Sequence, residues 1–232
     1  MPLPLYLAMT AAEISKKSSL PPNLAYMACH FSPYSTGLSN LPTELPPDSM
    51  LIVNDRIPVQ NHDPVKIREQ LEQLIGRFCI SGLLLDLQRP NEPQTRNIVK
   101  ALLGLPCPVA VTEQYADGLD CAVFISMPAH TPPEQLVSTW QGRSLWLEAA
   151  TDPLCVTLTE EGAHVSQEAP PADYPFRDDT LMCHYKTQVL EDQIRFHLRG
   201  DRQDLDDLLN YAPTLGFRCA VGLWQELAAA SE

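Results

Sequence analysis

The sequence has 232 residues, of which 44% are hydrophobic and 19% charged, a composition that suits a folded domain and excludes a disordered chain. The 29 acidic and 16 basic residues give a formal charge of -13, which disfavours nucleic acid and anionic membranes and favours a neutral or cationic small-molecule ligand. We expect one barrel-like domain over residues 1–232. The opening residues carry no basic leader and no run reaches the length of a membrane span, so we expect a cytoplasmic location.

In chain order, apolar runs at residues 3–12 and 24–30 predict two strands whose connection is too short for a full crossover helix. A loop over residues 31–48, rich in Pro, Ser, Thr and Asn, could cover a site. After residue 55 the pattern becomes regular. Helices are expected to begin near Pro64, Pro93 and Pro133, each leading into a further strand.

Later in the chain, residues 153–168 and 183–199 alternate apolar and polar residues about short acidic turns, which predicts two inserted antiparallel hairpins. A last helix is expected over residues 201–214. Core strands are expected to start near Leu5, Leu24, Met50, Leu83, Pro108, Cys121, Leu145 and Cys219. Eight such runs with few convincing helices favour an α/β fold: a compact, partly degenerate (β/α)8 TIM-like barrel with missing helices. The alternative is an open doubly wound sheet.

The seven cysteines are odd in number and contain no Cys-x-x-Cys pair. Most of them stand beside apolar residues in expected strands, where a reduced thiol packs as a small hydrophobic group. A reactive thiol among them is the alternative interpretation. The sequence therefore predicts no disulfide framework.

Several expected strands run directly into an acidic residue. These residues are Asp55, Asp86, Glu113, Glu148 and Glu226. Because parallel strands deliver their carboxyl ends to one edge, we expect these acids to meet at the barrel mouth. Trp146 and Glu148 lie two positions apart and share a face of their strand, and the same spacing relates Trp224 and Glu226. An indole beneath a carboxyl group, with other carboxylates near it, would raise the pKa of that group.

This arrangement resembles the TIM-barrel glycoside hydrolases. In the large clan of retaining barrels the acid/base follows strand four and the nucleophile follows strand seven, and the resemblance places Asp86 and Glu148 there. It departs from that clan at Leu85, where the clan has Asn, and in having Asp rather than Glu as the acid. The chitinase-type Asp-x-x-Asp-x-Asp-x-Glu is also absent from residues 83–90.

The remaining candidates would contact a carbohydrate ligand or tune the charge of the site. They are Asp55, Glu113, Glu226, His30, Gln88, Arg89, Tyr115, Trp146, Trp224 and Gln225. The alternative is that these residues have structural roles only. The acids would then cap turns or pair with Arg56 and Arg89, the tryptophans would pack in the barrel interior, and His30 would be held by hydrogen bonds.

No cofactor is expected, because the sequence lacks a Gly-rich phosphate-binding motif and has no lysine at the end of a core strand. No metal site is expected either, since a zinc site would need dispersed residues such as His30, Asp55 and Asp86. Besides a glycoside hydrolase-like enzyme, two alternatives stay open. One is a non-catalytic binding or assembly protein on the same barrel, with a second copy covering the strands that lack helices. The other is a metal-dependent lyase or hydrolase.

Overall fold

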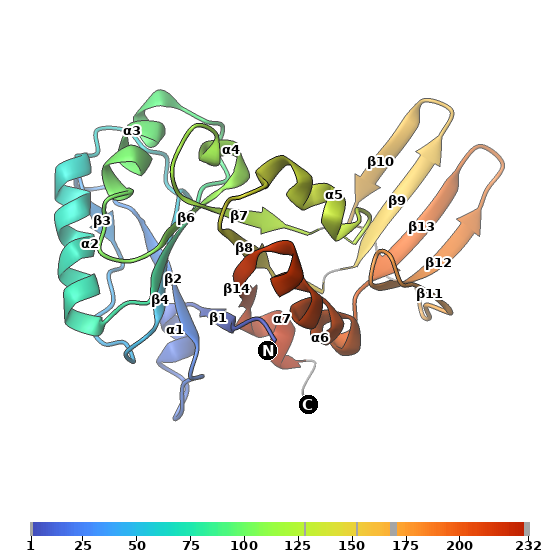
Figure 1. The fold of residues 1–232 in the computed structure, drawn as a ribbon, viewed down its shortest axis with the longest axis horizontal. Coiled ribbons are helices and arrows are strands. Elements are labelled where there is room, and N and C mark those ends of the chain that lie inside the picture. The colour runs from blue at the N-terminus through green and yellow to red at the C-terminus, as the bar shows by residue number, and fades with distance from the viewer. Residues whose placement is uncertain (1, 128, 152, 168–170, 230–232) are drawn as a thin grey trace.

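A computed structural model describes residues 2–127, 129–151, 153–167 and 171–229, which form a parallel barrel and a separate antiparallel sheet (Figure 1). The barrel strands are β1 (Leu5–Met9), β2 (Leu24–Phe31), β4 (Met50–Asn54), β5 (Gly82–Asp86), β6 (Val109–Thr112), β7 (Ala122–Ser126), β8 (Leu145–Glu148) and β14 (Phe217–Leu223). Strand β1 pairs with both β14 and β2, and these pairings close the ring. The predicted closed barrel is therefore confirmed, and the open sheet is excluded.

Side chains that alternate along these strands fill the barrel interior. The inward cluster comprises Ala8, Ala25, Met50, Ile52, Leu84, Ala110, Ala122, Phe124, Trp146, Cys219 and Val221. Trp146 is 4% exposed, and its ring lies against Gly82, where an added Cβ would come within 2.7 Å of Cη2. Asp86 and Glu148 follow the inward residues Leu84 and Trp146 by two positions, so both point to the inside of the barrel.

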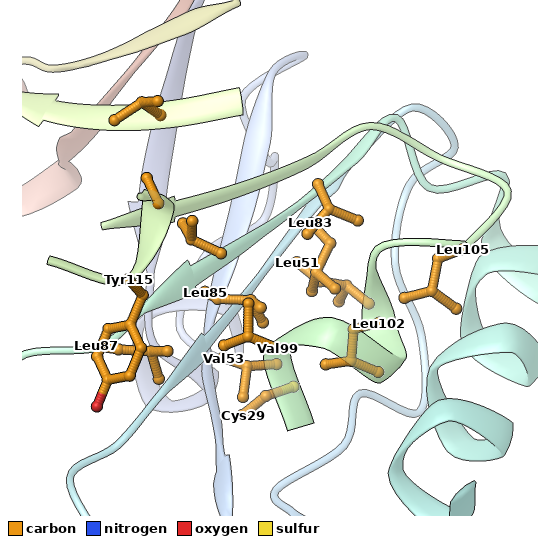
Figure 2. Packing of buried hydrophobic residues seen from close by; sticks show 14 of the residues in the cluster. Cys29, Leu51, Val53, Leu83, Leu85, Leu87, Val99, Leu102, Leu105 and Tyr115 are labelled. Atoms are coloured by element: carbon orange, nitrogen blue, oxygen red, sulfur yellow. The ribbon is translucent and has the colours of Figure 1, made fainter. Parts of the chain in front are cut away.

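The outward face of β4 and β5 packs against two full helices, α2 (Pro64–Phe78) and α3 (Pro93–Leu102). Figure 2 shows Leu51, Val53, Leu83 and Leu85 in this layer beside Val99 and Leu102. Helix α2 begins as its sequence predicts, with Asp63 accepting a hydrogen bond from the backbone of Val65 at 2.9 Å.

Several other connections are short, as predicted, whereas the predicted last helix is present as α6 (Arg202–Tyr211). The short connections include β3 (Leu38–Ser39), which pairs antiparallel to β2, and the single-turn helices α1 (Ala11–Ile14) and α4 (Glu113–Ala116). Helix α5 (Pro133–Val137) continues into the 3₁₀ turn η1 (Ser138–Trp140). Helix α6 continues into the 3₁₀ turn η2 (Ala212–Leu215). Helix α7 (Trp224–Ala229) follows β14. Within the described ranges, no helix has the length and apolar character needed to cross a membrane.

The two predicted hairpins are present, and they join into one sheet. They are β9 (Leu154–Thr159) with β10 (Gly162–Ser166), and β12 (Cys183–Val189) with β13 (Ile194–Arg199). Strand β13 also pairs with β9, and β11 (Phe176–Asp178) adds to β12, which gives one sheet in the order β10-β9-β13-β12-β11. An isolated hairpin is marginal in water, so joining two hairpins supplies the stability that each lacks. The sheet is inserted between β8 and α6 and projects to one side of the barrel (Figure 1).

Candidate functional site

A cavity of about 210 Å³ opens at the carboxyl ends of the barrel strands. Three of the five predicted acids line it: Asp86, Glu148 and Glu226. Its other walls include the apolar side chains of Met27 and Phe124. We call this the mouth cavity. It combines carboxyl oxygens with an apolar surface, as small-molecule sites commonly do.

The pKa of Asp86 differs from that of an ordinary aspartate. Burial raises the pKa of Asp86, and the negative charge of Asp55 adds a smaller increase. A hydrogen bond of 2.6 Å from Gln88 Nε2 to Asp86 Oδ1 opposes these effects by stabilising the ionised form. Because the net shift in pKa is upward, Asp86 holds its proton to higher pH than an ordinary aspartate does.

Asp55 holds the loop that carries Gln88. Its two carboxylate oxygens accept hydrogen bonds from the backbone N–H groups of Gln88 at 3.0 Å and Arg89 at 2.8 Å. The Arg89 guanidinium donates in return to the backbone carbonyls of Asp55 and Arg56, at 2.8 and 3.1 Å. Asp55 is 4% exposed, so its carboxylate fixes the loop after β5 rather than facing the mouth cavity.

Two other candidates also hold loops in place. Glu113 accepts a hydrogen bond from Trp140 Nε1 at 3.1 Å. Tyr115 is completely buried, and its hydroxyl donates to the carbonyl of Pro90 at 2.8 Å. Neither side chain lines the mouth cavity, so a role in ligand contact requires a rearrangement of its loop.

His30 lies on β2, where its ring is engaged on both sides. Its Nδ1 is 2.8 Å from the carbonyl oxygen of Phe31, and its Nε2 is 3.2 Å from Asn40 Nδ2. An Nδ1–H that donates to the carbonyl and an Nε2 that accepts from the amide satisfy both contacts with a neutral ring.

The prediction that Trp224 and Glu226 share a strand face is wrong, because β14 ends at Leu223 and these residues begin α7. Trp224 instead lies under Lys17, whose Nζ is 4.7 Å from the ring centroid. Gln225 donates to Glu13 Oε1 at 2.8 Å and ties α7 to α1. Glu226 reaches the mouth cavity from the helix rather than from a strand end.

Asn54 also lines the mouth cavity, although it was not among the predicted residues. It is the register partner of Asp86 across β4 and β5, and it follows the inward residue Ile52 by two positions. That spacing is the signal that would have selected Asn54 rather than Asp55.

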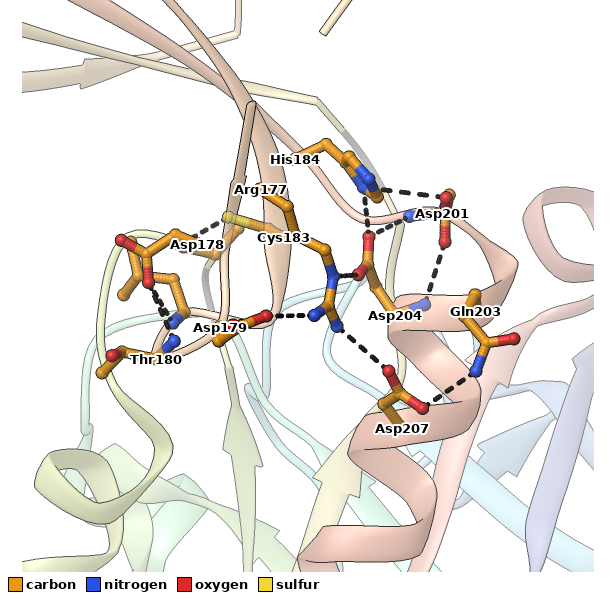
Figure 3. A network of polar contacts seen from close by, with 12 residues as sticks. Arg177, Asp178, Asp179, Thr180, Cys183, His184, Asp201, Gln203, Asp204 and Asp207 are labelled. Atoms are coloured by element: carbon orange, nitrogen blue, oxygen red, sulfur yellow. Dashed lines mark hydrogen bonds and ion pairs between the residues drawn. The ribbon is translucent and has the colours of Figure 1, made fainter. Parts of the chain in front are cut away.

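One group of side chains has the composition of a metal site, namely His184, Asp201 and Asp204, whose ligand atoms lie within 4.8 Å of one another. Its oxygens are already engaged (Figure 3). Asp204 accepts from Arg177 Nε at 3.0 Å and from His184 Nδ1 at 2.8 Å, while Asp201 caps α6 through the backbone of Asp204. The Arg177 guanidinium therefore already pairs with one of the three potential ligands, the carboxylate of Asp204. The alternative set of His30, Asp55 and Asp86 is not brought together within the described ranges.

No protein-family model matches the chain. The search of curated proteins likewise found no match. Solved structures do match: the spore cortex-lytic enzyme SleL of Bacillus cereus aligns at 12% identity and a TM-score of 0.55, covering 95% of this chain and 70% of that one. A chitinase of Chromobacterium violaceum aligns at 8% identity and a TM-score of 0.53, covering 98% and 97%. A mutant GH18 chitinase of Cycas revoluta, in complex with (GlcNAc)4, aligns at 11% identity and a TM-score of 0.53. That alignment covers 97% of this chain and 96% of the chitinase.

At these identities the comparison shows the fold alone, which is a TIM-like barrel with few helices and an added antiparallel sheet. The chitinase-type motif can be aligned along β5 by placing its last Asp on Asp86. Its Glu then falls on Gln88, and its first two Asp positions fall on Ser81 and Leu84. Of the four acidic positions of that motif, the chain keeps one.

Proposed function

We propose that the mouth cavity binds a carbohydrate containing N-acetylglucosamine and holds it without cleaving it. The observation that carries this proposal is the mouth cavity itself, which Asp86 and Glu148 line beside Phe124 and Met27. When the last Asp of the chitinase-type motif is placed on Asp86, the residue in the place of the motif's Glu is Gln88. A side-chain amide does not release a proton near neutral pH, so Gln88 cannot act as a general acid. The ligand class follows from the (GlcNAc)4 complex of the Cycas revoluta neighbour.

The polar groups of the site suit sugar hydroxyl and amide groups. Gln88 does not line the mouth cavity, but its Nε2 donates to Asp86 Oδ1 at 2.6 Å and so orients the Asp86 carboxyl group. The second oxygen of Asp86 and the carboxylate of Glu148 are acceptors for O–H or N–H donors of the ligand. Phe124 and Met27 offer an apolar surface to the C–H face of a sugar ring.

A second candidate is hydrolysis, with Asp86 as the proton donor and Glu148 as the nucleophile or charge stabiliser. The raised pKa of Asp86 favours this candidate, because a general acid must keep its proton near the working pH. The two candidates predict the same ligand and differ in whether a product forms. A cytoplasmic location and assembly into homo-oligomers stay predictions.

Calorimetric titration with (GlcNAc)4, followed by mass spectrometry of the incubated sugar, tests both candidates. The proposal expects saturable binding with no shortened product, and a loss of affinity of about tenfold in Asp86→Asn and in Glu148→Gln, the scale of one lost polar contact. Glu161→Gln, in the exposed turn between β9 and β10, is the matched control and should bind like the wild type. Absence of binding would overturn the proposal. A shortened product that disappears in Asp86→Asn would establish hydrolysis instead.

A further inference from the structure

The antiparallel sheet, which projects to one side of the barrel, has an apolar face (Figure 1). Residues in register across antiparallel strands lie on the same face, and the register of β10, β9, β13 and β12 gives two adjacent rows on one face. The rows consist of Ala163, Leu158, Ile194 and Val189, and of Val165, Val156, Phe196 and Thr187. Seven of these eight side chains are apolar and none is charged. We call this surface the sheet face.

The sheet face is open to solvent. Val189 is 74% exposed, and Val165, Leu158 and Ile194 are 42%, 39% and 38% exposed. The next row toward the barrel is different, since its Leu198 is only 4% exposed. An apolar sheet face normally packs against a second layer, and contiguous exposed apolar surface marks an interaction site. The two outer rows therefore suit a partner.

The opposite face of the same strands is polar and already has contacts. Its side chains alternate with those of the sheet face and include His184 and Lys186. Lys186 pairs with Asp173, and His184 pairs with Asp204 at 2.8 Å. Cys155, on this face of β9, is 1% exposed. The apolar side is therefore the one that is open to a further layer.

Charge decides which partner fits the sheet face. Two hairpin tips beside it are acidic, with Glu160 and Glu161 between β9 and β10, and Glu191 and Asp192 between β12 and β13. These carboxylates repel an anionic membrane or an acidic protein. The formal charge of -13 also makes two copies of the chain repel each other, so they approach most easily through a surface without charge. The sheet face is such a surface, and a second copy supplies an identical one.

Two sheet faces can stack as the layers of a β-sandwich, about 10 Å apart. A two-fold axis that lies between the layers and crosses the strands makes the contact self-complementary and closes the assembly at two copies. The same axis sends the two barrels, and the acidic tips, to opposite ends. Four strands about 4.8 Å apart form a face roughly 20 Å wide. This is smaller than a standard interface, so the dimer is expected to be weak.

We propose that the protein forms a homodimer in which the sheet faces of two copies stack. Pairing along the edge strand β10 would leave Leu158, Ile194 and Val189 exposed, whereas stacking covers them. None of the eight side chains lines the mouth cavity, so this inference is independent of the proposed sugar binding.

Sedimentation equilibrium from micromolar to millimolar concentration tests the dimer. Val189→Glu places a carboxylate in the contact of each copy. Gln188→Glu makes the same change of charge one residue away, on the exposed opposite face of β12, and is the matched control. Val165→Glu is a second disrupting variant from the other side of the sheet face. Because Val189 is 74% exposed, its replacement should leave the fold intact, which circular dichroism checks.

The wild type should pass from monomer to dimer with rising concentration. Val189→Glu and Val165→Glu should raise the dissociation constant about a hundredfold or more, because each buries unpaired carboxylates, while Gln188→Glu should behave like the wild type. A wild type that stays monomeric throughout, or a Val189→Glu variant that dimerises as strongly as Gln188→Glu, would overturn the proposal. Binding of the monomeric wild type to neutral phosphatidylcholine vesicles, lost in Val189→Glu, would overturn it in favour of a lipid surface.

Discussion

Asp55→Ala should destabilise the protein far more than the loss of an ordinary helix cap. The Asp55 carboxylate accepts two backbone hydrogen bonds, at 3.0 Å from Gln88 and 2.8 Å from Arg89, and the residue is 4% exposed. A hydrogen bond to a charged group contributes about 1.5–3 kcal/mol, so removing both predicts a loss of roughly 3 kcal/mol or more. The loop that presents Gln88 to Asp86 would then lose its anchor.

The matched control is Asp63→Ala, which removes a carboxylate that accepts one backbone hydrogen bond, from Val65 at 2.9 Å, at the start of α2. Loss of such a cap costs about 1 kcal/mol. Equilibrium unfolding in urea measures the two variants, and the free energies of unfolding should differ by about 2 kcal/mol. If Asp55→Ala lost no more stability than Asp63→Ala, Asp55 would not be the anchor of the loop.

Three further predictions concern the barrel interior and the thiols. Because burial raises the pKa of Asp86, ionising this carboxyl group costs free energy in the folded state, so Asp86→Asn should be more stable than the wild type in thermal unfolding at pH 7. The stability difference should vanish below about pH 4, where the wild-type carboxyl group is protonated in both the folded and the unfolded state. A stability difference that did not change with pH would contradict this prediction. Gly82→Ala places a Cβ 2.7 Å from Cη2 of Trp146 and should cost about 1–3 kcal/mol in urea unfolding; a neutral effect would mean that the indole is free to move. In the native protein a thiol reagent at about pH 8 should modify the exposed Cys79 rapidly. Cys29 is buried and its pKa is raised to about 12, so it should react only when the protein unfolds. Modification of Cys29 before unfolding would contradict its burial.

The barrel strands could be predicted because strands buried on both faces leave continuous apolar runs in the sequence. The shared face of Trp146 and Glu148 followed from their two-residue spacing, and the structure shows the same relation between Leu84 and Asp86. The two-residue spacing did not settle the direction of Asp55, because the sequence does not show whether Asn54 or Asp55 faces the barrel interior. Asn54 is the one in register with Asp86, and only the pairing of β4 with β5 reveals it.

Two features depended on contacts that the local sequence does not contain. Residues 219–226 repeat the strand-to-acid pattern, but a helical turn after Leu223 buries Leu227, which is 3% exposed and lies against Gly222. The helix is thus accompanied by a tertiary contact of Leu227 that the local sequence does not reveal. The pairing of β9 with β13 joins segments about 35 residues apart, and hairpin signals describe only neighbouring strands.

A crystal structure of the protein soaked with (GlcNAc)4 tests the central claim most directly. The account predicts an intact sugar in the mouth cavity, with a hydroxyl or amide group within hydrogen-bonding distance of the Asp86 and Glu148 carboxyl groups. A sugar bound elsewhere, with these two carboxyl groups untouched, would contradict it.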